Sequence, residues 1–197
     1  MQESAYSSKR IAKNTVVLYA RSIVIMLISL YTSRVILQQL GVEDYGIYSV
    51  IGGLVSMLSL ISSSLSASVS RFITFELGRG DKEKLRKIFS TSVLIQLGIV
   101  LVVLIVAEVI AMWFLRTQMQ IPAGRETAAE WVLHCSIIVF CINLISVPYN
   151  ACIIAHEHMK AFAYISILDA MLKLGVSFCL AVSPVDKLIF YAVLMAA

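Results

Sequence analysis

Long apolar runs that are almost free of charge constrain this chain more than any other feature. Five of them exceed the roughly 20 residues that an α-helix needs to cross a bilayer core, and a shorter sixth run ends with the chain. The runs cover residues 14–37, 47–70, 88–115, 131–155, 161–182 and 188–197. Only 14% of the sequence is charged, against roughly 25% in an average soluble domain. The sequence therefore predicts an all-α protein, a polytopic transmembrane helix bundle.

The sixth run is too short to span a membrane, and the chain stops inside it without a charge or a stop signal. We therefore expect five complete helices and the start of a sixth. Residues 1–197 are expected to form a single N-terminal transmembrane lobe, cut within its sixth helix.

Basic residues are unevenly distributed over the segments between the runs. Ten Lys and Arg residues lie in the N-terminal segment and in every second loop after it, whereas the remaining loops hold three. Short loops rich in Lys and Arg stay on the cytoplasmic side, so we expect a cytoplasmic N-terminus. The first run is longer than the apolar part of a signal peptide and contains Arg21 and Arg34, which indicates an uncleaved span.

Motifs of soluble chemistry are missing from the sequence. The basic loop at 76–87 lacks the GK[ST] ending of a phosphate-binding loop and has no interleaved aromatic residues, which favours a solvated turn attracted to anionic lipid. The four cysteines have no CxxC spacing. Consecutive His156, Glu157 and His158 diverge by ~100° per residue on a helix and converge poorly on a metal. We expect no metal, no cofactor, no nucleic-acid partner and no enzyme activity.

Five charged residues interrupt the apolar runs, and such residues are costly in a membrane unless they face a polar interior. They are Arg21, Arg34, Glu108, Asp169 and Lys173. Asp169 and Lys173 are four residues apart with the acid first, the favoured order for an ion pair within a helix. Self-neutralisation and a role in a transport pathway both stay open for this pair. Arg34 lies near the outer end of its run, where snorkelling to the interface explains it.

Small and polar residues line one side of most of these helices. With ~100° per residue, the first run carries a stripe of Arg21, Ser22, Ser29, Thr32 and Ser33. The second run has a seam of Ser49, Gly52, Ser56, Ser59, Ser63, Ser66 and Ser70. This seam favours close helix packing, with a hydrated cavity as the alternative. The fourth run carries Ser136, Asn143, Ser146 and Asn150, together with Pro148, for which a static kink and a hinge are both open.

Depth along the helices indicates which charged residues meet. At ~1.5 Å per residue, Arg21 lies roughly 10 Å, Asp169 about 12 Å and Lys173 about 18 Å from the start of their helices. We therefore expect these three residues to meet in the inner half of one bundle. Two cations and one acid leave a net positive site, which suits an anionic head group. Glu108 and Arg34 also match in depth, at roughly 30 Å, and form a second, weaker candidate pair.

Three stretches of the chain carry a family resemblance. They read KRIAKNTVVLYARSIVIMLISLYTSRVILQQLGVEDYGIYSVIGG at Lys9–Gly53, SRFITFELGRGDKEKLRKIFST at Ser70–Thr91 and VPYNACIIAHEHMKAFAYISILDAMLKLG at Val147–Gly175. In this order they resemble the amino-terminal part of the Wzx-type polysaccharide-biosynthesis flippases, or O-antigen transporters. These belong to the multidrug, oligosaccharidyl-lipid and polysaccharide exporter superfamily.

The resemblance implies a two-lobe exporter of the bacterial cytoplasmic membrane, in which this chain supplies the first lobe and a missing C-terminal lobe is its partner. The substrate class would be an oligosaccharide linked to a polyprenyl pyrophosphate, translocated by alternating access during polysaccharide or lipopolysaccharide biosynthesis. Arg21 matches a basic residue that is consistent with pyrophosphate binding in the family. Lys173 joins it as a substrate-binding candidate, Asp169 and Glu108 are candidates for ion coupling, and Pro148 is the candidate hinge.

Three other functions compete with a flippase. A small-molecule or drug antiporter of the same superfamily that exports cations should have an acidic cavity, whereas the first helix here carries arginine and no carboxylate. A membrane-bound glycan transferase would need a catalytic loop at the interface, and the loops are short. A purely structural protein would leave the polar faces of four helices unexplained.

Overall fold

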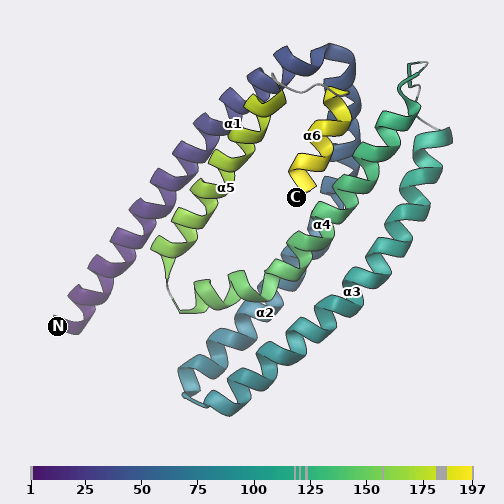
Figure 1. Cartoon of the computed structure of the whole chain (residues 1–197). Coiled ribbons are helices and arrows are strands. Elements are labelled where there is room, and N and C mark those ends of the chain that lie inside the picture. Colours follow the sequence, from purple (N-terminus) through teal and green to yellow (C-terminus); the bar gives the residue numbers. More distant parts are fainter. Residues whose placement is uncertain are drawn as a thin grey trace.

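The computed structural model describes residues 2–117, 119, 121–122, 124–156, 158–180 and 186–196, with side chains from Asn14 onward except that of Ile61. These residues form six α-helices and no strand (Figure 1). The helices are α1 (Gln2–Met57), α2 (Ser59–Arg79), α3 (Lys82–Thr117), α4 (Glu126–Ala155), α5 (Met159–Cys179) and α6 (Lys187–Ala196). The prediction of an all-α transmembrane helix bundle is confirmed.

The first two predicted runs lie on either side of a kink inside α1, where two helical segments join without a loop. α1 continues past the first run and bends at Gly41, where φ is 82° and ψ is 174°. This positive φ is a conformation that side chains with a Cβ rarely adopt. The chain turns there and descends again as the second half of α1, as Figure 1 shows at the top of the view.

The second predicted run is split between two helices. α1 ends at Met57 and α2 begins at Ser59, so Leu58 interrupts the run. The backbone N–H of Leu58 still donates to the carbonyl of Val55 at 3.0 Å, which keeps the descending path nearly continuous. α2 is rich in serine, and four other helical segments are long and apolar enough to cross a membrane: Asn14–Met57, Lys82–Thr117, Glu126–Ala155 and Met159–Cys179.

α3 begins at a capped turn that follows α2. α2 ends at Arg79 and is followed by Gly80, whose φ is 74°. The carboxylate of Asp81 then accepts a hydrogen bond from the backbone N–H of Lys84 at 3.1 Å. This bond is the main reason why the pKa of Asp81 lies below its usual value. Such a cap satisfies one of the free N–H groups at the start of a helix, so the turn between α2 and α3 is well defined.

α4 is the centre of the bundle and packs against α2, α3 and α6. Its buried residues include Leu133, Ile137 and Leu144, which belong to the main apolar cluster of the lobe. α1 and α5 lie side by side as a second layer, and α6 sits between this layer and α4 (Figure 1). Many large apolar side chains on α1, α3 and α5 are exposed, which is what a lipid-facing surface requires.

Pro148 lies inside α4 and its side chain is buried. Proline has no N–H to donate to the carbonyl one turn earlier, and its ring crowds that turn. In Figure 1 the last, light-green part of α4 turns away from the axis of the rest of the helix. The predicted kink is therefore present, and its use as a hinge stays a prediction.

Candidate transport site

Arg21 points into the seam between α1 and α5. Its guanidinium carbon lies 4.4 Å from the centroid of the Phe162 ring, a distance at which a cation is attracted to the face of an aromatic ring. The Nε atom of Arg21 is buried and has no hydrogen-bond partner. A guanidinium in this position retains donor capacity for an anion.

Lys160 adds a second cation beside Arg21. Both side chains line a cavity of about 240 Å³ between α1 and α5, together with Val17, Val24 and Tyr164. No carboxylate is among the described lining residues. The cavity is therefore electropositive and smaller than a typical drug pocket of roughly 300–1,000 Å³, which suits a compact anionic group. Sequence reasoning counted Lys160 only as a loop charge, because its depth relative to Arg21 depends on where α5 starts.

Asp169 and Lys173 form an ion pair within α5, with Nζ and Oδ2 2.8 Å apart. Their side chains are 59% and 50% exposed, respectively, so this pair is not buried within the lobe. Phe162, which contacts Arg21, lies two helical turns from Asp169, or about 10 Å along the axis. The structure thus joins Asp169 to Lys173, whereas Arg21 of α1 contacts α5 two turns earlier, at Phe162.

The polar sides of α1 and α5 face the same way. Ile36 of α1 and Leu180 at the end of α5 pack with Tyr191 of α6 in one cluster. At ~100° per residue, Leu180 shares an arc of about 40° with Asp169 and Lys173. On α1, Ser22, Ser29 and Ser33 lie within an arc of about 60° that also contains Ile36. The exposed serines and the charged pair therefore lie on the side of this layer where α6 packs.

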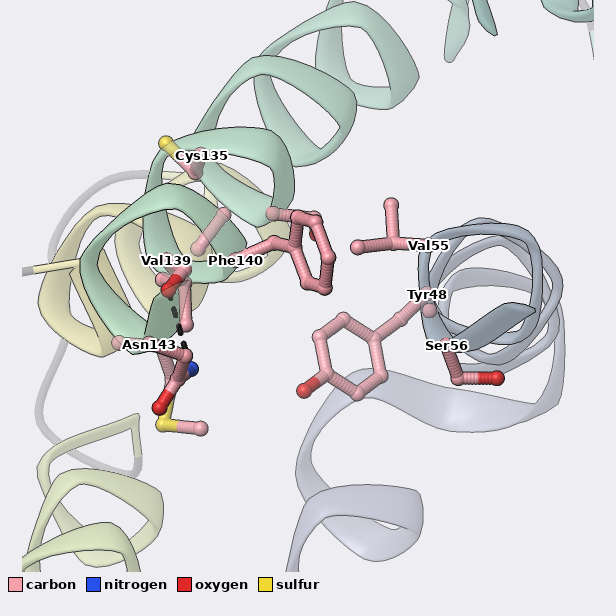
Figure 2. Close-up of a pocket in the computed structure, with 11 residues that line it drawn as sticks. Tyr48, Val55, Ser56, Cys135, Val139, Phe140 and Asn143 are labelled. Carbon is pink, nitrogen blue, oxygen red and sulfur yellow. Dashed lines mark hydrogen bonds between the residues drawn. The ribbon is translucent and has the colours of Figure 1, made fainter. Parts of the chain in front are cut away.

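A second pocket, of about 210 Å³, lies between the second half of α1 and α4 beside α6, and its mostly apolar wall carries a few polar side chains (Figure 2). The described side chains around it come from α1, α4 and α6: Tyr48, Gly52, Val55, Ser56, Cys135, Ser136, Val139, Phe140, Asn143, Ala192 and Met195. Members of the predicted seam and of the predicted polar face of the fourth run thus border one pocket.

The small-residue seam of the second run is open at Gly52 and Ser56. A Cβ added to Gly52 would meet no atom within 4 Å, and Ser56 is exposed and donates to the carbonyl of its own helix at Gly53. At Gly52 and Ser56 the alternative of an open surface therefore fits better than close helix packing. In Figure 2 the ring of Tyr48 lies in the gap between α1 and α4, and its hydroxyl points away from Val55.

Glu108 pairs with His134 rather than with Arg34, which corrects the second candidate pair. The Nδ1 atom of His134 lies 2.8 Å from a carboxylate oxygen of Glu108, and Arg34 is exposed. His134 and Ser136 are separated by about 200° around α4, so the pair is on the opposite side of this helix from the pocket. Sequence reasoning missed His134 because the partner depends on how α3 and α4 align.

A cluster of charges at the far end of the lobe was also missed. Arg125 lies 3.0 Å from Asp44 and 2.6 Å from Asp186, and Lys187 donates to the carbonyl of Gln39 at 3.3 Å. This cluster ties the bend of α1 to the turn before α4 and to the start of α6. Its residues lie outside the apolar runs in loops of unremarkable composition, so only the three-dimensional structure reveals it.

The described residues offer no metal-binding site. They contain no group of three or more His, Cys, Asp or Glu side chains able to hold an ion. All four cysteines are free, with Cys135 and Cys141 buried, as small apolar groups often are. The structure does not describe Glu157, and His156 and His158 stack with their ring centroids 6.2 Å apart.

The comparisons with known proteins agree with a membrane exporter. The model of the MatE family matches residues 13–179, which is most of the chain. Searches of curated proteins and of solved structures give no match. The matched segment includes Arg21 and Phe162, the α1 and α4 residues of the pocket at Asn143, and the Asp169–Lys173 pair. The chain therefore belongs to the MatE family, multi-pass membrane transporters of the multidrug, oligosaccharidyl-lipid and polysaccharide exporter superfamily.

Proposed function

We propose that this chain is the N-terminal lobe of a flippase for a polyprenyl-pyrophosphate-linked oligosaccharide. The single observation that carries the proposal is the positive cavity around Arg21 and Lys160, whose described lining holds no carboxylate. A pyrophosphate needs cationic donors, and a guanidinium binds phosphate oxygens through its planar fork. Lys173 lies further along α5 as a second contact for the substrate, although Asp169 neutralises part of its charge.

The polar surfaces beside α6 support a route for the sugar. A large polar head group cannot cross hydrocarbon without hydrogen-bonding partners, and the serines of α1 and the pocket at Asn143 supply them. These surfaces are shallow and exposed, so one lobe provides only one wall of a route. A C-terminal lobe facing them would close the cavity, and rocking of the two lobes would expose it to each side in turn.

Asp169 is the better placed of the two candidates for ion coupling. It lies on the polar side of α5, whereas Glu108 is paired with His134 on the other side of α4 from the pocket.

Bending at Pro148 would move the end of α4 relative to α5. With the N-terminus in the cytoplasm of a bacterial cell, the Arg21 cavity faces the side on which lipid-linked oligosaccharides are assembled.

A small-molecule or drug antiporter is the second candidate. Tyr48, Phe140 and Met195 around the pocket offer aromatic and polarisable contacts of the kind that small apolar ligands use. A cationic drug would also require a nearby carboxylate, and the described lining of this pocket has none. The flippase therefore fits the charges better.

Glycan export by the complete protein, expressed in a strain that lacks its own flippase, tests the proposal. Arg21→Ala should abolish export at unchanged abundance, and Arg21→Lys should retain part of it because the charge remains. Arg34→Ala is the matched control and should export normally, since Arg34 is exposed and away from the seam. Normal export by Arg21→Ala would refute the role of the arginine. Drug resistance without glycan export would favour the antiporter.

A further inference from the structure

A second basic cavity lies at the opposite end of the lobe from the Arg125 cluster, next to the turn between α2 and α3. It measures about 250 Å³ and is lined by Ile73, Lys82, Leu85, Arg86, Phe89 and Cys152. These residues come from three helices, α2, α3 and α4. The cavity therefore belongs to the packed part of the bundle and not to a loop.

The lining separates into an apolar part and a charged rim. Ile73, Leu85 and Phe89 are apolar, and the Phe89 ring is held edge-on against Tyr149 with the centroids 5.4 Å apart. Lys82 and Arg86 stand in the first two turns of α3, before the apolar run that begins at residue 88. The cavity thus crosses the level at which the membrane core meets its polar surface.

The two rim cations have no partner of their own. Asp81 and Glu83 are the acids that flank Lys82 in the sequence. Asp81 is engaged by Lys84, with Nζ and Oδ2 3.3 Å apart, and Glu83 forms no ion pair within the described residues. Neither Lys82 nor Arg86 makes a hydrogen bond or ion pair within the described part of the chain. Both also lie at the N-terminal end of α3, where the helix dipole favours an anion.

We propose that this cavity is a binding site for an anionic phospholipid, with the phosphate on Lys82 and Arg86 and the start of one acyl chain against Ile73, Leu85 and Phe89. A free phosphate ion shares the head-group chemistry but leaves the apolar part empty. A zwitterionic lipid fills the apolar part, but the positive group of its head would be repelled by Lys82 and Arg86. Only an anionic lipid matches both halves. The site is separate from the Arg21 cavity and does not depend on the substrate of the transporter.

Cys152 provides a direct readout because its thiol lines the cavity. The complete protein with Cys179→Ser leaves Cys152 as the accessible thiol of the described lobe, since Cys135 and Cys141 are buried; any cysteine outside this chain is also changed to serine. The rate of maleimide labelling is measured in uncharged detergent with phosphatidylglycerol, with phosphatidylcholine of the same acyl chains, or with inorganic phosphate. We expect phosphatidylglycerol to slow labelling at least fivefold and the other two additions to change it less than twofold.

Charge variants complete the test. Lys82→Gln with Arg86→Gln should raise the half-protecting concentration of phosphatidylglycerol about thirtyfold, because each cation near an anionic lipid contributes a factor of about five. Arg79→Gln with Lys87→Gln removes the same residue types from outside the cavity and should leave that concentration unchanged. If labelling of Cys135 shows that the first double variant has lost its fold, the single substitutions replace it. Equal protection by phosphatidylcholine, protection by phosphate alone or an equal loss in the control pair would each overturn the proposal.

Discussion

The guanidinium of Arg125 lies 3.0 Å from the carboxylate of Asp44, a side chain that is only 6% exposed. Asp44 follows the Gly41 bend of α1, and Arg125 precedes α4. The same guanidinium also bonds to Asp186, whose backbone and side-chain oxygens cap the start of α6. One arginine therefore links three helix ends, and its loss would leave a buried carboxylate without a counter-charge.

Replacement of this arginine should destabilise the lobe. We expect Arg125→Gln to lower the free energy of unfolding by about 2 kcal/mol, because a buried charge left without its partner is costly. Thermal unfolding of the purified protein in detergent, followed by tryptophan fluorescence, measures the effect. Arg116→Gln is the matched control: its pair with Glu130 is largely exposed, and such pairs contribute about 0–1 kcal/mol.

A double variant separates the ion pair from mere loss of packing. Adding Asp44→Asn to Arg125→Gln removes the unpaired charge and should restore part of the lost stability. If both arginine variants unfold at the same temperature, or if the double variant is no more stable than Arg125→Gln alone, the cluster does not hold the helix ends together.

The ring of Phe162 should position Arg21 for its ligand. Phe162→Leu keeps the apolar contact but removes the cation–π attraction, which contributes about 0.5–1 kcal/mol at partly exposed sites. We expect glycan export to fall about two- to fivefold while abundance is unchanged. Phe178→Leu is the control, since Phe178 packs on Tyr31 in the same seam, with centroids 6.2 Å apart, but does not touch the arginine. Equal export by the two variants would show that Arg21 does not need the ring.

The sequence predicted the helical bundle well because span length and scarcity of charge are local properties. It also predicted the Asp169–Lys173 pair, since residues four apart on a helix are neighbours whatever surrounds them. Pairs between helices could not be predicted in this way. Depth alone suggested that Glu108 pairs with Arg34. In the structure, α3 and α4 are aligned so that Glu108 contacts His134 instead.

The helix boundaries failed where the backbone departs from regular geometry. Gly41 lies beyond the first apolar run, so hydropathy places the end of the helix at residue 37 although the helix continues to the glycine. Leu58 is as apolar as its neighbours, and nothing in the composition marks the break between α1 and α2. Lys160 was not predicted as a site residue for a similar reason: the residue at which α5 begins decides whether Lys160 lies at the same depth as Arg21.

Two carboxylates can be compared directly as ion-coupling groups. If Asp169 carries protons, Asp169→Asn should flatten the dependence of transport on pH, because an amide neither takes up nor releases a proton. Glu108→Gln, on the far side of α4 from the pocket, should keep the pH profile of the parent. Transport into membrane vesicles at a series of external pH values measures both. An unchanged profile for Asp169→Asn would assign the Asp169–Lys173 pair a structural role.

Pro148→Ala tests whether the bend in α4 moves during transport. Alanine restores the N–H that can donate to the carbonyl of Leu144 and removes the clash of the ring, so the helix should straighten and stiffen. We expect export to fall at least fivefold while the protein inserts normally and unfolds at the same or a higher temperature. Pro122→Ala, in the turn before α4, is the control and should export normally. Full export by Pro148→Ala would mean that transport needs neither the kink nor bending at Pro148, because a straightened helix would then serve the transport cycle equally well.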